Sequence, residues 1–189
     1  NTVISGSGAI EFHTVNINKG NSYETVIELT RSYTASGLSG APFNIVNGTL
    51  RATYVNLTPN FTIPATGGLW LGAGTVSTGA GNLVVNGYFN NVGATLNVGT
   101  LQNHSLIMGA GSVVSLYGGV NNIAGSIRVA NASDPVTLSI TGGTTTLAMV
   151  GNSDAAFATF DLGTGASYFN AASNTTTNVL IRNVNFRAT

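Results

Sequence analysis

Charged side chains are scarce in this chain. It contains six Lys or Arg and six Asp or Glu among 189 residues, whereas an ordinary soluble domain is about a quarter charged. Between Arg51 and Arg128 none of these four residue types occurs. A net charge of zero with scattered cations gives no electrostatic footprint for nucleic acid, so we expect no nucleic-acid partner. Because few groups titrate, we also expect folding stability to depend little on pH.

Cysteine and long apolar runs are also missing. A chain without cysteine has no disulfide, no thiolate metal site and no cysteine nucleophile. No apolar run approaches the roughly 20 residues of a membrane-spanning helix, so we expect no membrane-spanning segment. The sequence begins at Asn1 rather than Met, which we interpret as the result of signal-peptide removal. We therefore expect an extracellular protein.

Residues that could support catalysis are few and dispersed. His13 and His104 lie far apart in the sequence, whereas a nucleophilic triad needs a base beside a hydroxyl. Histidines among amide and hydroxyl neighbours are typically surface polar residues. Asp134, Asp154 and Asp161 are isolated, and turn capping explains the first two. No calcium motif or phosphate loop is present, so we expect no enzymatic activity, no cofactor and no metal.

The residues that are present predict an all-β protein. Apolar and polar residues alternate, as in Val136, Leu138 and Ile140, and no stretch keeps the spacing of a helix face. Gly and Asn interrupt these runs at pairs such as Asn47-Gly48 and Gly142-Gly143, which supply the positive φ of tight connections. We predict eleven or twelve strands, including 24–33, 43–46, 49–57, 82–89, 94–99, 105–108, 112–117, 126–130, 136–141, 144–150, 156–162 and 177–187.

Two architectures compete for these strands. Residues 68–130 consist of short apolar triplets separated by Gly and Asn, which is typical of a β-solenoid, or right-handed β-helix. The outer segments 24–33 and 177–187 are longer and carry most of the Glu and Arg, like strands of a sandwich. Because the solenoid period is not constant, we favour a jelly-roll-like β-sandwich over residues 19–189, with the solenoid as the alternative.

Residues 1–18 form an extended, β-prone segment, which we predict to be an N-terminal donor strand. Such a strand can add to the open sheet edge of another copy, and a contact of this kind does not close, so that it generates a filament. Alternatively, residues 9–18 are the first strand of their own domain. The candidate donor residues are Val3, Ile4, Ile10, Phe12, Val15 and Ile17.

Asparagine also occurs in six glycosylation sequons. The acceptors are Asn47, Asn56, Asn60, Asn103, Asn131 and Asn174, and sugars there would hydrate a surface that lacks charge. Trp70 and the six tyrosines could form a platform for sugar stacking, although aromatic residues in β-domains more often fill cores or interfaces.

Together, the apolar N-terminal segment, the Gly-, Thr- and Asn-rich β body, the low charge and the sequons resemble archaeal extracellular threads and bundling pili, which are TasA-like filament proteins joined by donor-strand complementation. The resemblance implies a glycosylated structural subunit of a cell-surface appendage that polymerises with itself and functions in adhesion or biofilm formation, in contact with cell surfaces or polysaccharide. The solenoid-like middle departs from that family. The alternative function is a β-solenoid adhesin or carbohydrate-binding surface module.

Overall fold

A computed structural model describes residues 2–5, 10–30, 33–35, 43–53, 55, 57, 59–101, 103–148, 158–163, 165, 168–171, 177–182 and 184–186. These residues form 22 strands and no helix. The all-β prediction is confirmed. Within the same residues, no helix has the length and hydropathy needed to cross a membrane.

Three sheets contain most of the strands, and we number them 1 to 3. Sheet 1 consists of β1 (Thr2–Ile4), β4 (Val26–Leu29), β6 (Phe43–Ala52), β8 (Gly67–Leu71), β11 (Tyr88–Asn91), β14 (Val113–Leu116), β17 (Thr137–Ile140) and β20 (Tyr168–Ala171), with β3 (Val15–Asn18) paired to β6. Sheet 2 consists of β7 (Phe61–Ile63), β10 (Leu83–Val85), β13 (Leu106–Met108), β16 (Ile127–Val129), β19 (Ala158–Asp161) and β22 (Val184–Phe186). Sheet 3 consists of β9 (Thr75–Ser77), β12 (Thr95–Val98), β15 (Val120–Ile123), β18 (Gly143–Ala148) and β21 (Thr177–Arg182), and β2 (Ile10–Phe12) pairs separately with β5 (Tyr33–Ala35).

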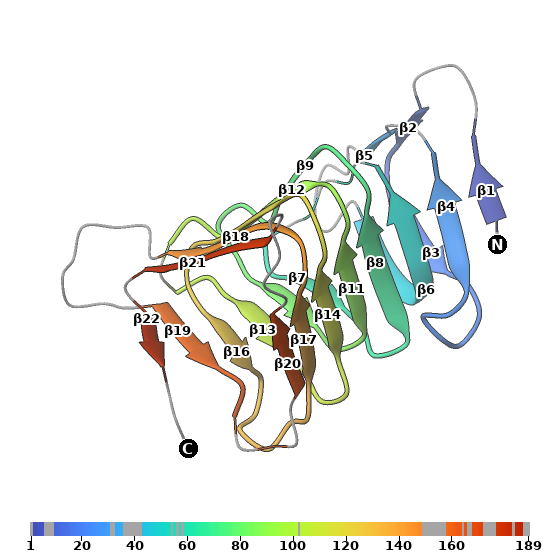
Figure 1. Cartoon of the computed structure of the whole chain (residues 1–189). Coiled ribbons are helices and arrows are strands. Elements are labelled where there is room, and N and C mark those ends of the chain that lie inside the picture. The colour runs from blue at the N-terminus through green and yellow to red at the C-terminus, as the bar shows by residue number, and fades with distance from the viewer. Residues whose placement is uncertain are drawn as a thin grey trace.

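The chain passes through sheets 2, 1 and 3 in turn and then repeats the circuit, for example β7, β8, β9 and then β10, β11, β12. Each strand lies parallel to its counterpart in the next circuit. The result is a β-solenoid of about five turns, with the N- and C-terminal strands at opposite ends of the stack (Figure 1).

The jelly-roll prediction is therefore wrong, and the solenoid alternative describes the fold. A jelly roll pairs antiparallel strands, whereas the ladders of the described residues are parallel. Unequal turns conceal the repeat in the sequence, since one turn advances 19 residues from Leu50 to Leu69 and another advances 31 from Leu138 to Phe169.

The strand boundaries differ from the prediction at the corners of the solenoid. The predicted run 82–89 contains two strands, β10 and β11, whereas the predicted strands 43–46 and 49–57 are joined in β6. The Asn47-Gly48 pair is a bend within β6, where Gly48 has φ +79°. A Cβ at Gly48 would lie 2.5 Å from the Lys19 carbonyl oxygen, so the bend requires glycine.

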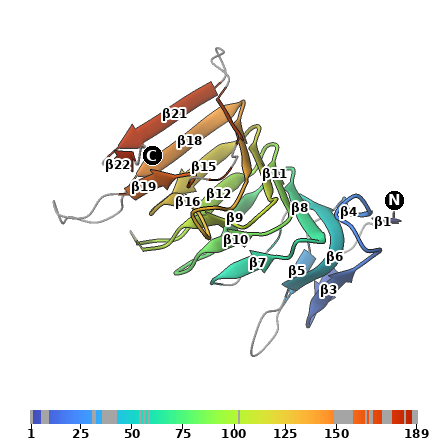
Figure 2. The same ribbon diagram turned by 90° about the horizontal axis from the view of Figure 1, so that it is seen from below.

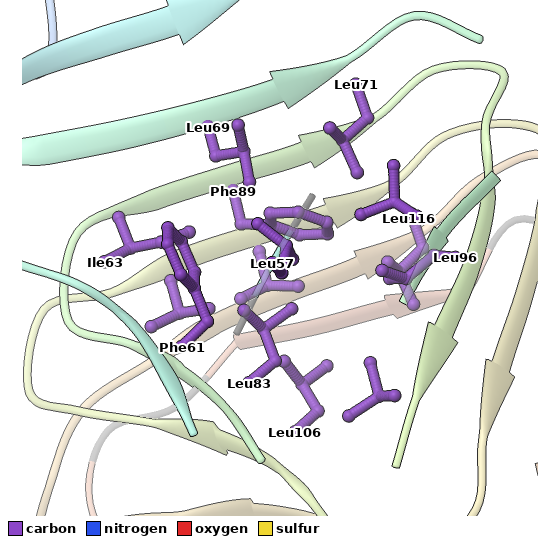
Figure 3. Packing of buried hydrophobic residues seen from close by; sticks show 14 of the residues in the cluster. Leu57, Phe61, Ile63, Leu69, Leu71, Leu83, Phe89, Leu96, Leu106 and Leu116 are labelled. Carbon is purple, nitrogen blue, oxygen red and sulfur yellow. The ribbon is translucent and has the colours of Figure 1, made fainter. Parts of the chain in front are cut away.

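Inward-facing side chains of all three sheets form one apolar core. In sheet 1, Leu50, Leu69, Phe89, Val114 and Leu138 occupy one register position and are all fully buried. Figure 3 shows Leu69 and Phe89 facing side chains of the other two sheets across this interior. Because each sheet buries one face, its strands keep the alternation of inward apolar and outward polar residues.

A second interior feature is a polar ladder beside the apolar core, which we call the interior amide ladder. Asn91 Nδ2 donates to Asn121 Oδ1 at 2.7 Å, and Asn121 Nδ2 donates to Thr145 Oγ1 at 3.2 Å. The backbone N–H of Ala94 donates to Asn91 Oδ1 at 2.9 Å. All three side chains are buried, and these hydrogen bonds offset the cost of removing amides from water.

The predicted donor strand lies in the chain's own solenoid in this structure. β1 pairs with β4, β2 with β5 and β3 with β6. Ile17 is buried and Val15 is half-buried, whereas Val3 and Ile4 are exposed. The side chains of Ile10 and Phe12 lie outside the described residues. Donation of residues 1–18 to a neighbouring copy stays a prediction.

Candidate functional site

The outer face of sheet 1 brings together the single tryptophan, two tyrosines and an oppositely charged pair. Strand residues alternate between the two faces of a sheet. Leu69 and Leu71 are buried, so Trp70, which lies between them, faces outward. Register pairing then aligns Glu28, Arg51, Trp70 and Asn90 in one outward file. We call the following group the aromatic platform: Tyr23, Glu28, Arg51, Trp70, Tyr88 and Asn90.

Arg51 covers part of the tryptophan. Its guanidinium carbon lies 4.1 Å from the centroid of the Trp70 ring, and its Nε lies 3.7 Å from Glu28 Oε1. The Arg51 and Glu28 side chains are 46% and 30% exposed. An exposed cation–π contact contributes about 0.5–1 kcal/mol and an exposed ion pair about 0–1 kcal/mol. Arg51 is therefore held loosely and can move aside for a ligand at low cost.

Tyr23 and Tyr88 extend the aromatic surface beside Trp70. Their ring centroids lie 5.8 Å apart with an angle of 16° between the ring planes. Tyr23 comes from the turn between β3 and β4, and Thr49 Oγ1 donates to its carbonyl oxygen at 2.5 Å. Gly68 lies in register between Thr49 and Tyr88, and a Cβ there would meet Thr49 Oγ1 at 2.2 Å. The missing side chain at Gly68 thus makes room for the turn to fold onto the sheet.

Asn90 positions one of the tyrosines of the platform. Its Nδ2 donates to the Tyr88 hydroxyl at 3.1 Å. Its Oδ1 is buried and has no hydrogen-bond partner among the described residues. Exchanging the amide nitrogen and oxygen would leave the nitrogen unpaired instead. A buried polar atom without a partner costs about 1–3 kcal/mol. Because this oxygen is covered, Asn90 contributes to the platform by holding the Tyr88 hydroxyl.

The platform combines apolar faces with a few directed polar groups, as small-molecule sites do. A sugar ring presents an apolar C–H face and a rim of hydroxyls. Tyr23, Tyr88 and Trp70 offer surfaces for such a face, while Arg51 and Glu28 provide donors and acceptors at the rim. Trp70 does not fill the core, and the alternation Leu69-Trp70-Leu71 is the signal that places it outside. The alternative that it fills an interface stays a prediction.

The described glycosylation acceptors differ in exposure. Asn103 and Asn131 are exposed in turns. Asn60, also exposed, has φ +59°, and its Oδ1 accepts from Asn82 Nδ2 at 2.9 Å. Asn47 is half-buried, and its Nδ2 donates to Asn18 Oδ1 at 3.0 Å. A glycan on Asn47 would disrupt that hydrogen bond. Asn56 and Asn174 lie outside the described residues.

Two of the residues considered for catalysis, His104 and Asp134, have structural roles. His104 is buried, contrary to the expectation of a surface residue, and its Nδ1 accepts from the backbone N–H of Thr100 at 3.1 Å and of Leu101 at 3.2 Å. His13 is exposed. Asp134 Oδ2 accepts from the backbone N–H of Asn131 at 3.1 Å, which confirms turn capping.

Of the two remaining aspartates, only Asp161 is described by the structure. Asp161 Oδ1 accepts from the backbone N–H of Gly163 at 2.9 Å, and Asp154 lies outside the described residues. Groups of three or more His, Cys, Asp or Glu placed to hold a metal are absent from the part of the chain that the structure describes.

The fold and this outer face define a parallel β-solenoid that carries an aromatic surface site. Comparison of the chain with protein-family models, curated proteins and solved structures finds no match.

Proposed function

We propose that this chain is a carbohydrate-binding surface module of adhesin type, with the aromatic platform as its binding site. The observation that carries the proposal is the grouping of the chain's single tryptophan, a stacked tyrosine pair and an Arg–Glu pair on one outer face. In a chain with twelve charged residues, a random placement would rarely bring these groups together. The sequons and the low charge support an extracellular location.

Binding depends on packing supplemented by hydrogen bonds. The apolar face of a sugar ring packs on Trp70 after Arg51 moves aside, or on the Tyr23–Tyr88 pair. Its hydroxyls reach Arg51 and Glu28, which are partly exposed, while Asn90 holds Tyr88 in place. A neutral sugar carries no charge that salt could screen, and Arg51 and Glu28 carry opposite charges. Binding of such a sugar should therefore depend little on salt. The solenoid contributes a rigid sheet that fixes the positions of these side chains.

Tryptophan fluorescence tests the proposal directly, since Trp70 is the only tryptophan. The protein is titrated with cellohexaose, maltohexaose, mannohexaose and chitohexaose. We expect at least one of them to change the emission of Trp70. Tyr88→Ala and Asn90→Ala should each weaken that response about tenfold, or ~1.4 kcal/mol. Tyr117→Ala is the matched control, because Tyr117 is 59% exposed and lies outside the platform. No response to any of the four sugars would refute the platform.

A second candidate function is the filament subunit suggested by the sequence. The observation that favours it is β1, which pairs on one side within the described residues and exposes Val3 (54%) and Ile4. An apolar edge strand of this kind can pair with another chain. Insertion into a neighbour would require residues 1–18 to leave their present partners. Electron micrographs of native material test it: continuous fibres support a filament, and discrete particles contradict it.

A further inference from the structure

A groove of about 470 Å³ runs across the outer face of sheet 3, on a different side of the solenoid from the platform. Strands β9, β12, β15 and β18 lie side by side there (Figure 2). Each strand contributes one polar side chain to the groove. These are Ser77, Asn97, Asn122 and Thr146.

These four residues form a regular file along the solenoid axis. Ser77 pairs with Asn97, Asn97 with Asn122 and Asn122 with Thr146 in the parallel ladders. Neighbouring strands are separated by roughly 4.8 Å, so hydrogen-bonding groups recur at that interval. A site that repeats with the turns of the solenoid suits a ligand that is itself a repeating chain.

The turn after β12 forms part of the groove wall and is held firmly. Gly99 and Thr100 line the groove. Gly99 has φ +74°, and its N–H donates to Thr78 Oγ1 at 2.9 Å. The N–H of Thr100 donates to buried His104. The groove is thus shaped before any ligand arrives, which lowers the entropy lost on binding.

The chemistry of the lining is uncharged throughout. Amides and hydroxyls both donate and accept hydrogen bonds, whereas Ile123 and Ala124 at the base of the groove are buried. Asn122 Nδ2 donates to Asn97 Oδ1 at 2.8 Å, so the two amides are aligned along the ladder. Without a cation in the lining, the groove offers nothing to neutralise an acidic polymer.

We infer that this groove binds one chain of a neutral polysaccharide, lying along the solenoid axis, with successive turns contacting successive sugar units. It is a second site, independent of the platform, and it goes beyond the proposed function because it takes a polymer rather than a single sugar ring. A chain bound there extends over several turns, so affinity grows with ligand length.

The test is affinity electrophoresis through gels that contain neutral polysaccharides (cellulose derivatives, starch, mannan or xylan), followed by calorimetry with oligosaccharides of two, four and six units. We expect retardation by at least one polysaccharide and an affinity that rises about tenfold from the shortest to the longest ligand. The Asn97→Ala, Asn122→Ala double variant should lose the retardation and the length dependence. Thr144→Ala is the matched control, since Thr144 faces outward on β18 but does not line the groove.

The results of these experiments distinguish binding in the groove from binding at the platform. The electrophoresis is done in a Tyr88→Ala background, because an intact platform would itself retard the protein. In that background, retardation that survives in the double variant overturns the groove, as does retardation by an acidic polysaccharide in place of all the neutral ones. A Trp70 response of the unmutated platform to the oligosaccharides, with no retardation in the Tyr88→Ala background, supports the platform and refutes the groove. Length-dependent binding that the double variant loses, without a Trp70 response, supports the groove and refutes the platform. The melting temperature of each variant checks that a loss of binding is not a loss of folding.

Discussion

Asn121 and Asn122 are neighbours on β15 that face opposite sides of the sheet, and replacing each by alanine compares a buried amide with a partly exposed one. Asn121 belongs to the interior amide ladder, where it accepts from Asn91 and donates to Thr145. Asn122 donates to Asn97 in the groove. Asn121 thus makes more hydrogen bonds than Asn122 in the same strand and is also buried, so its environment differs in both respects.

The expected costs follow from that difference. Asn121→Ala removes the hydrogen bonds to Asn91 and Thr145 and a longer one to the Gly118 carbonyl oxygen at 3.4 Å, which contribute about 1 kcal/mol each or less, and it leaves Asn91 and Thr145 short of partners at about 1–3 kcal/mol in total. We expect the free energy of unfolding to fall by about 3–6 kcal/mol. Water replaces the lost bond at Asn122, so Asn122→Ala should cost less than about 1 kcal/mol.

Urea denaturation followed by circular dichroism measures both values, with an unchanged slope confirming that the same transition is compared. A double-mutant cycle between Asn91 and Asn121 should show coupling of at least about 1 kcal/mol, because the two amides share a hydrogen bond. Equal costs at Asn121 and Asn122, or additive effects at Asn91 and Asn121, would refute the idea that the ladder stabilises the interior.

Four further outcomes are expected. Gly68→Ala should destabilise the protein by about 1–3 kcal/mol through overlap with Thr49 and should reduce the Trp70 fluorescence response; unchanged stability and response would contradict the role assigned to Gly68. Ile17→Ala should cost about 2–4 kcal/mol because Ile17 is buried, whereas Val3→Ala should cost under about 0.5 kcal/mol; equal values in a denaturation experiment would show that residues 1–18 are not packed as described. Mass spectrometry of native material should find glycans on Asn103 and Asn131 but not on Asn47, and a modified Asn47 would exclude its present hydrogen bonding. With six carboxylates in the chain, the melting temperature should change by only a few degrees between pH 7 and about pH 3, and a steep loss would reveal a carboxylate with strongly different proton binding in the folded and unfolded states.

The sequence predicted the strands better than their arrangement. The alternation around Leu138 and Ile140 places both residues inside, as the structure does. However, an alternation of period two is common to parallel and antiparallel sheets, so it could not distinguish a solenoid from a sandwich. The direction of pairing depends on how each corner turns the chain, and the corners differ in length from one turn to the next.

The candidate site was only partly accessible from the sequence. The outward position of Trp70 follows from its two leucine neighbours. The Tyr23–Tyr88 contact does not, because it joins a turn before β4 to a strand in a later circuit. The groove likewise depends on the register between β9, β12, β15 and β18, which unequal turn lengths hide from any search at a fixed spacing.

The stacking of turns determines the order in which parts of the molecule unfold. Each circuit is hydrogen-bonded only to the circuits before and after it in the described ladders, so its free energy resembles that of a one-dimensional chain of coupled units. Fraying should then begin at a terminal circuit and advance one circuit at a time, with the middle circuits exchanging their amide hydrogens last. A surface module built in this way can lose material from an end under protease or mechanical load and still present the sites on its central turns.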